Sequence, residues 1–177
     1  MTMLPVLPAP LRKPGVFITA TDTGVGKTVV SCSIAWSLRR AGLRVGACKP
    51  MATGCQSERE GLVNEDAEAL AHFSDCRAPL DVINPLRFAP PLAPGVAAAE
   101  AGVPMDYAAI GRSLVQLDQS NDVIVVEGAG GLLVPIDPVN VELTMLDLMR
   151  ALGYPVVVVA RSLLGTLNHT EIGRAHV

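Results

Sequence analysis

A glycine-containing segment between an apolar run and a helical pattern constrains the fold of this chain more than any other feature. Residues 16–20 are apolar and have the length of a buried strand, and residues 27–40 carry apolar side chains at helical spacing. Between them, residues 21–26 are mostly polar or glycine and lead into the triplet Gly26-Lys27-Thr28. Backbone N–H groups at such a loop and helix start point at one spot and favour an anion there. The order of these segments therefore predicts a phosphate-binding loop.

The residue types of this loop suit a triphosphate bound together with Mg²⁺. Glycine lets the backbone approach a phosphate closely, lysine places a cation beside it, and a threonine hydroxyl is a hard oxygen ligand. The strict form of the motif has glycine where this chain has Thr21, so the flanking strand and helix carry the prediction. The residues expected to bind the nucleotide from this segment are Gly24, Val25, Gly26, Lys27, Thr28 and Val29.

The rest of the chain continues the alternation of strands and helices. Further strands are predicted at residues 43–48, 122–126 and 156–160. Helices are predicted at residues 64–73, 105–118 and 141–151 and from about Gly165, whereas the proline-rich segment 74–95 is expected to be a loop. This order predicts an α/β fold with a P-loop NTPase-like parallel sheet flanked by helices. In such sheets ligands bind beyond the carboxyl ends of the strands.

Composition excludes several classes of protein. With 14 basic and 17 acidic side chains the net charge is −3 and no basic stripe is present, so nucleic acid is not expected as a partner. No uninterrupted apolar run reaches the roughly 18 residues of a membrane span. Prolines interrupt the first residues, so 1–14 are expected to form a flexible tail rather than a secretory signal. The four cysteines lack zinc spacing and are expected to be reduced thiols of a cytoplasmic protein.

Five segments in order resemble those of the dethiobiotin synthetase family. They are Ala20–Thr28, Lys49–Gly54 (KPMATG), Asn64–Ala67 (NEDA), Val126–Gly131 (VEGAGG) and Ala160–His169 (ARSLLGTLNH). The departure is Ala20, where the family usually has glycine. The resemblance implies an ATP-dependent ligase of biotin biosynthesis. It would close the ureido ring of dethiobiotin from 7,8-diaminononanoate and CO₂, through a carbamate and its mixed anhydride with phosphate.

The same resemblance implies roles for particular residues. Lys49 would be catalytic, and Thr53 would bind the substrate. The Mg²⁺ ligands would be Thr28, Asp66 and Glu127. The nucleotide would also contact Asp66 and the turn Glu127, Gly128, Ala129 and Gly130. Gly165, Thr166, Leu167 and Asn168 would hold the substrate carboxylate in the neighbouring subunit, which implies a homodimer with shared active sites.

Three other functions remain open at this point. A related P-loop amide-forming enzyme of cobalamin biosynthesis shares the phosphate loop and the EGAGG-like turn, but usually carries an added glutaminase domain. A ParA/MinD-like ATPase switch usually has an extra lysine early in the loop, and residues 20–24 contain none. The third is an inactive fragment.

The end of the chain departs from the resemblance. Members of the family continue for several tens of residues, with further strands and an adenine-recognising element. The final segment, EIGRAHV, matches what a common sequencing adapter encodes. Residues 15–170 are therefore expected to form an incomplete domain that lacks its C-terminal strands, and residues 171–177 a non-native tail.

Overall fold

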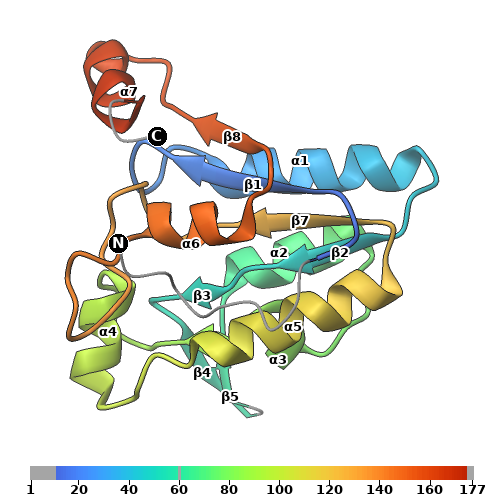
Figure 1. Ribbon diagram of the computed structural model, residues 1–177, viewed down its shortest axis with the longest axis horizontal. Helices are drawn as coiled ribbons and strands as arrows, with labels where there is room; N and C mark the ends of the chain where they lie inside the picture. The colour runs from blue at the N-terminus through green and yellow to red at the C-terminus, as the bar shows by residue number, and fades with distance from the viewer. Residues whose placement is uncertain (1–10, 60, 175–177) are drawn as a thin grey trace.

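A four-stranded parallel sheet forms the centre of the protein, as a computed structural model that describes residues 11–59 and 61–174 shows (Figure 1). The strand order is β2-β7-β1-β8. The strands are β1 (Gly15–Ala20), β2 (Val45–Cys48), β7 (Val123–Glu127) and β8 (Val156–Val159). Ile18 pairs with Glu127 and Cys48 with Val126, so β1, β2 and β7 end at the same edge. The predicted α/β fold is confirmed.

Helices cover both faces of this sheet and bury its apolar side chains. On one face, α1 (Lys27–Arg40) and α2 (Glu65–Ser74) pack over side chains such as Ile18 and Val125. On the other, α4 (Pro94–Ala101), α5 (Tyr107–Ser120) and α6 (Met145–Leu152) pack over side chains such as Phe17 and Val126. Because successive strand residues point to opposite faces, a sheet covered twice is apolar at almost every position. This explains the continuous apolar runs in the sequence.

The proline-rich segment 74–95 contains more structure than the sequence predicts. It holds the short helix α3 (Leu80–Ile83), the strand β6 (Leu86–Arg87) and the start of α4. Pro79 precedes α3 and Pro94 begins α4. Proline is tolerated at these positions because the first helical N–H groups have no intrahelical partner. The expectation of a loop throughout this segment is therefore wrong.

Several short elements and boundaries also differ from the predictions. The strand β3 (Met51–Ala52) pairs in parallel with β6, and β4 (Gln56–Glu58) pairs with β5 (Gly61–Val63) in an antiparallel hairpin. The helix predicted at 141–151 begins only at Met145, because the Thr144 N–H donates to Asp147 Oδ2 at 2.8 Å and closes a capping box.

The two ends of the chain are described in part. In the predicted tail, the N–H groups of Arg12 and Lys13 donate to Asp118 Oδ1 at 3.0 and 2.7 Å, whereas residues 1–10 lie outside the described residues. At the other end, α7 (Thr166–Arg174) follows β8, and residues 175–177 of the predicted non-native tail lie outside the described part. None of the helices in the described ranges is long and apolar enough to cross a membrane.

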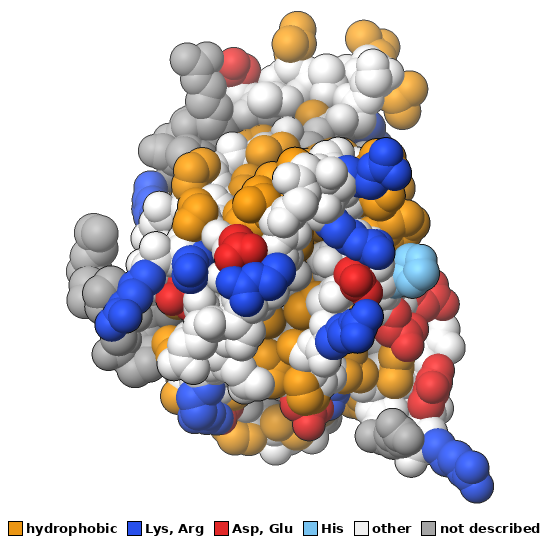
Figure 2. All heavy atoms as spheres, turned by 90° about the vertical axis from the view of Figure 1, so that its right-hand side faces the viewer, with side chains coloured by type: hydrophobic (Ala, Val, Ile, Leu, Met, Phe, Trp, Pro, Cys, Tyr) orange, Lys and Arg blue, Asp and Glu red, His pale blue; other side chains and the backbone are white. Residues whose placement is uncertain are grey.

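Opposite charges are interspersed on the face where the strands begin, which is the right-hand side of Figure 1. Figure 2 shows this face, with basic and acidic side chains lying beside one another. Arg44 pairs with Asp122 at 2.6 Å and Arg39 with Asp75 at 3.6 Å. Arg44 therefore holds the pKa of Asp122 below its usual range, mainly through its side-chain hydrogen bond.

Gly95 lies where α4 approaches the backbone of the loop that precedes α6 closely. Its N–H donates to the Pro135 carbonyl at 3.1 Å, and a Cβ added at Gly95 would lie 2.5 Å from the Asp137 carbonyl oxygen. Gly95→Ala is expected to lower the free energy of unfolding by about 2 kcal/mol, since backbone atoms must shift to make room. Urea denaturation measures the loss. The half-exposed neighbour supplies the control, because Val96→Ala should change stability by less than about 0.5 kcal/mol; an equal loss in both variants would contradict the steric argument.

Candidate functional site

The loops that follow β1, β2 and β7 meet at one edge of the sheet and, with residues from the end of β3 and the start of α2, line a cavity of about 430 Å³. The cavity joins segments that are far apart in the sequence and gathers most of the predicted phosphate-loop residues with Lys49, Thr53 and Asp66, whereas Val25, Glu127, Gly128 and residues 165–168 are outside its lining. Its lining consists of Thr23, Gly24, Gly26, Lys27, Thr28, Val29, Lys49, Ala52, Thr53, Asn64, Asp66, Ala129 and Gly130.

The phosphate loop depends on glycine at two positions. Gly24 has φ 71° and Gly26 has φ 98°, in the left-handed region that other residues rarely adopt. Gly26 precedes α1, whose first N–H groups therefore face the cavity. At the position of the missing glycine, the Thr21 N–H donates to the Val159 carbonyl at 3.0 Å, so Thr21 extends the contact between β1 and β8. The departure from the strict motif therefore leaves the phosphate-facing turn intact.

Lys49 lies at the centre of the cavity's charged groups. Its ammonium donates to Asp66 Oδ2 at 2.8 Å and to Glu127 Oε1 at 2.7 Å. The side chains of Lys49 and Glu127 are 4% and 0% exposed, whereas that of Asp66 is 46% exposed. Burial lowers the pKa of Lys49, but the charges of Glu127 and Asp66 outweigh burial, and the pKa is raised above its ordinary value. Lys49 therefore carries a positive charge at neutral pH.

The second lysine of the cavity, Lys27, is also buried. Burial and the charge of Lys49 lower its pKa, against the opposing charges of Glu127 and Asp66. Burial raises the pKa of Asp66, but the charge and hydrogen bond of Lys49 outweigh it and lower the pKa. The two lysines and two carboxylates thus form one interacting group.

The oxygen atoms around Glu127 fit a divalent cation. Thr28 Oγ1 donates to Glu127 Oε1 at 3.0 Å, and Glu127 Oε2 is buried without a hydrogen-bond partner among the described residues. The described part of the chain gathers no cluster of three or more His, Cys, Asp or Glu side chains. One hydroxyl and two carboxylates are nevertheless the donors by which Mg²⁺ is held beside substrate phosphates, because this ion keeps several waters or phosphate oxygens.

Asn84 holds the backbone of Lys49 and is absent from the sequence-based predictions. Its Nδ2 donates to the Lys49 carbonyl at 2.6 Å, and the Lys49 N–H donates to the Ile83 carbonyl at 2.7 Å. Asn84 is fully buried. The only signal in the sequence is a lone amide in an apolar, proline-rich segment, which does not reveal a partner 35 residues away.

Asn84→Ala is expected to lower the free energy of unfolding by about 1–3 kcal/mol, because the Lys49 carbonyl then has no donor. A urea titration gives the value. Asn121→Ala is the matched control, because it also removes an amide. Asn121 is half-buried at the end of α5, and its Nδ2 donates to the Leu117 carbonyl of the same helix at 2.9 Å. If the Asn121 variant loses as much stability as the Asn84 variant, the loss does not come from the hydrogen bond between Asn84 and the Lys49 carbonyl.

The turn after β7 divides its residues between the sheet and the cavity. The Gly128 N–H donates to the Ile18 carbonyl at 2.9 Å, so it continues the sheet. Ala129 and Gly130 line the cavity, where Gly130 adopts φ 61°. Gly165, Thr166, Leu167 and Asn168 lie at the start of α7 and outside this cavity, and their place in a neighbouring subunit's site stays a prediction. Arg161, in the loop before them, bonds to Asp22 of the phosphate loop.

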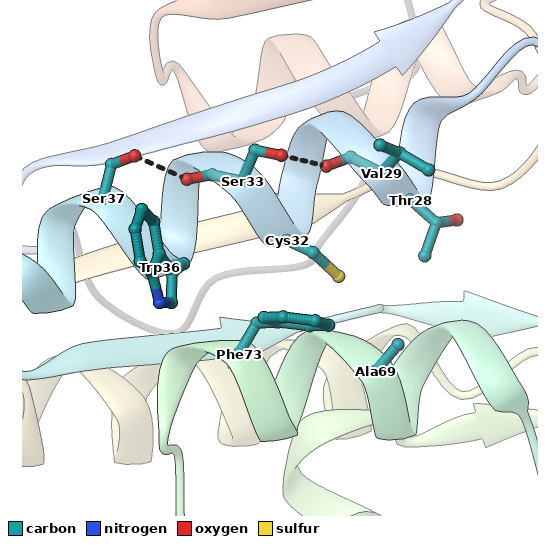
Figure 3. A pocket seen from close by; sticks show the side chains of 8 residues that line it. All are labelled: Thr28, Val29, Cys32, Ser33, Trp36, Ser37, Ala69 and Phe73. Atoms are coloured by element: carbon teal, nitrogen blue, oxygen red, sulfur yellow. Dashed lines mark hydrogen bonds between the residues drawn. The ribbon is translucent and has the colours of Figure 1, made fainter.

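A second cavity, of about 490 Å³, lies between α1 and α2 beside the phosphate loop (Figure 3). Cys32, Trp36 and Phe73 give it an apolar lining. The Ser33 and Ser37 hydroxyls donate to carbonyls of α1, as the dashed lines show, so they are already engaged. Burial raises the pKa of the Cys32 thiol to about 11, which keeps it protonated near neutral pH. This cavity therefore lacks the charged groups that phosphate chemistry needs.

Comparison with known proteins agrees with the geometry of the charged cavity. A family model described as an AAA domain matches residues 14–174. The chain is 46% identical over 158 residues to the ATP-dependent dethiobiotin synthetase of Anaeromyxobacter sp. (strain K), covering 89% of this chain and 68% of that protein. It is 39% identical over 167 residues to the protein of the same name from Xanthomonas euvesicatoria pv. vesicatoria. This match covers 94% of this chain and 73% of that protein.

Among solved structures, the signal recognition particle receptor FtsY from Elizabethkingia anophelis in complex with GDP superposes with a TM-score of 0.50 at 19% identity. The match covers 98% of this chain and 50% of that one, and shows the fold alone. The two curated relatives are similar over most of this chain and over about two thirds or more of their own length. By these matches, the chain belongs to the ATP-dependent dethiobiotin synthetase family of ligases.

Proposed function

We propose that the protein uses ATP and Mg²⁺ to close the ureido ring of dethiobiotin from 7,8-diaminononanoate and CO₂. The observation that carries the proposal is that a single cavity contains the phosphate loop, the Lys49 ammonium and the Thr53 side chain. A phosphate donor and a second substrate must meet in any ATP-dependent ligation. Membership of the dethiobiotin synthetase family supports the proposed identity of that substrate.

The reaction needs ATP because a carbamate is a poor electrophile. One amine of the substrate attacks CO₂ and loses a proton, which gives a carbamate with a resonance-stabilised negative charge. A carbamate oxygen then attacks the γ-phosphorus of ATP, and the bond from that phosphorus to the bridging oxygen breaks as ADP leaves. The second amine attacks the carbonyl carbon of the mixed anhydride and loses a proton. Phosphate leaves as the ring closes.

The residues of the cavity suit phosphoryl transfer, in which positioning and charge neutralisation supply most of the rate enhancement. Lys27 and the N–H groups at the start of α1 would bind the β- and γ-phosphates. Lys49 would stabilise negative charge on the carbamate and on the transferred phosphoryl group. Thr28, Asp66 and Glu127 would hold Mg²⁺, which neutralises phosphate charge when bound. Thr53, at the end of β3, would hydrogen-bond the substrate.

The proposed assembly is a homodimer in which residues 165–168 of one subunit bind the substrate carboxylate at the other subunit's site. Backbone N–H groups at the start of α7 would serve as donors. The nearby side chains of Leu163, Leu164 and Leu167 are exposed, which favours contact with a second subunit. Residues 15–170 are proposed to act as one domain. The use of ATP and the four free cysteines support a cytoplasmic location.

One assay tests the proposal. The purified protein is incubated with ATP, Mg²⁺, bicarbonate and 7,8-diaminononanoate, and dethiobiotin and ADP are measured by mass spectrometry. Formation of both in equal amounts, dependent on the diamine, is expected. ATP hydrolysis that yields no dethiobiotin and is stimulated by DNA or lipid vesicles would refute the proposed ligase reaction. It would indicate that the protein is an ATPase switch instead.

A further inference from the structure

The Lys49 ammonium takes the position between the two carboxylates that a divalent cation would need. It bonds to Asp66 and Glu127 simultaneously, at 2.8 and 2.7 Å. Glu127 Oε1 also accepts from Thr28 Oγ1 at 3.0 Å, so two donors already use both lone pairs of this oxygen. All three candidate cation ligands are therefore linked to one another through protein hydrogen bonds.

A cation bound to Glu127 Oε1 and Asp66 Oδ2 would compete with the Lys49 ammonium for these oxygens. Mg²⁺ binds oxygen at about 2.0–2.1 Å, and an ammonium held on the same atoms would be a close positive charge that repels it. The unpartnered, fully buried Glu127 Oε2 shows that Lys49 satisfies this carboxylate only in part. A buried acceptor without a donor is costly, and a cation that binds the whole carboxylate would remove that cost.

The charges of the cavity favour a cation that arrives with phosphate. Lys27 and Lys49 balance Asp66 and Glu127, so the interacting groups are neutral together. A bare divalent cation would leave an excess of positive charge beside the buried Lys49 and Glu127 side chains. A nucleotide phosphate would compensate that charge, since the phosphate loop lines the same cavity.

We propose that Lys49 occupies the cation site in the ligand-free protein and is released toward the second substrate only when a cation–nucleotide complex displaces it. The backbone of Lys49 is held at both its N–H and its carbonyl, by Ile83 and Asn84, so the flexible side chain alone moves. Thr53, which would bind the second substrate, lines the same cavity as Lys49. The cation–nucleotide complex therefore binds before Lys49 is available for the ligation. This inference rests on the proposed function only for the identity of the cation and the second substrate.

The first test measures Mn²⁺ affinity in the absence of nucleotide, by electron paramagnetic resonance of free Mn²⁺. Lys49→Met and Lys27→Met each remove one positive charge from the cavity, but Lys27 interacts with the carboxylates only through its charge. Lys49→Met is expected to tighten Mn²⁺ binding by at least about tenfold more than Lys27→Met, because it also vacates the ligands. Equal tightening in both variants, or none in Lys49→Met, would refute the displacement.

The second test uses the unmodified chain, so it does not depend on how the variants fold. Acetic anhydride labels exposed amines, and mass spectrometry reports the labelling rate of Lys49 with ADP and EDTA and with ADP and Mg²⁺. The rate is expected to rise by about fivefold or more when Mg²⁺ is added, because the buried ammonium is released. An unchanged rate would overturn the proposal. Neither test contains the diamine, so a protein that passes both and makes no dethiobiotin would refute the proposed reaction and leave the displacement standing.

Discussion

Lys49→Met is expected to reduce the turnover number for dethiobiotin formation by about 10³-fold, because a positive charge that would act on the transferred phosphoryl group is lost from the transition state. In the ligand-free protein the Lys49 side chain is 4% exposed and hydrogen-bonded to two carboxylates, and its release by the cation–nucleotide complex would bring this charge to the reacting groups. ATP affinity should change much less, by under about tenfold, since Lys27 and the helix N–H groups remain. Steady-state kinetics with saturating diamine and a separate ATP titration give the two values.

A matched control separates the loss of Lys49 from the loss of one positive charge anywhere on the protein. Arg44→Met removes a cation at the face where the strands begin, where the Arg44 side chain is 66% exposed, and should leave the turnover number and the ATP affinity unchanged. A fall in ATP affinity as large as the fall in turnover would mean that Lys49 binds the nucleotide rather than stabilising the transferred group.

Glu127→Leu is expected to lower the free energy of unfolding by about 3 kcal/mol, which is the usual cost of removing one partner from a buried ion pair. Lys49 would then retain only the half-exposed Asp66, while its ammonium stays buried. In the Lys49→Met background the same substitution should cost less than about 1 kcal/mol, because no unpaired charge remains. Urea denaturation of the four proteins of this double-mutant cycle measures the difference.

Asp66→Asn serves as the comparison within the same cluster. Its partner is the same lysine, but the side chain is 46% exposed, so water compensates part of the loss, and the expected cost is under about 1 kcal/mol. If Glu127→Leu costs the same with and without Lys49, the stability of this region comes from packing of residue 127 and not from the ion pair.

Local patterns account for the parts of the fold that could be predicted. The phosphate loop can be located from the sequence, because an apolar run of strand length precedes it and apolar side chains at helical spacing follow Gly26. Both patterns lie within about 25 residues of the chain. The proline-rich segment 74–95 does not follow the loop prediction, because proline is typical both of loops and of helix starts. Whether a proline starts a helix or lies in a loop depends on whether the residues after it can pack against another part of the fold. For α4 that part is the loop near Asp137, more than 40 residues later in the sequence.

The candidate site shows the same limit. Thr28, Lys49, Asp66 and Glu127 are each visible at the end of a strand or the start of a helix, and the resemblance assigns them roles. Their mutual arrangement depends on the strand order β2-β7-β1, which places β7 between two strands that precede it in the sequence. The bonds from Lys49 to Asp66 and Glu127, and from Asn84 to Lys49, follow from that order and not from any spacing along the chain.

The position of the charged cavity within the sheet also determines when it would be lost as the protein unfolds. Glu127 ends β7 and the phosphate loop follows β1, and these two strands are the interior ones, with neighbours on both sides. Amide groups of interior strands open to solvent almost only in global unfolding, whereas edge strands such as β8 open in cheaper, local events. A molecule that has transiently released β8 and α7 is therefore expected to keep Glu127 and the phosphate loop in register, whereas Lys49 follows β2, the strand at the other edge. Nucleotide binding would then persist in partly opened molecules, while any contribution from the start of α7 would be lost first.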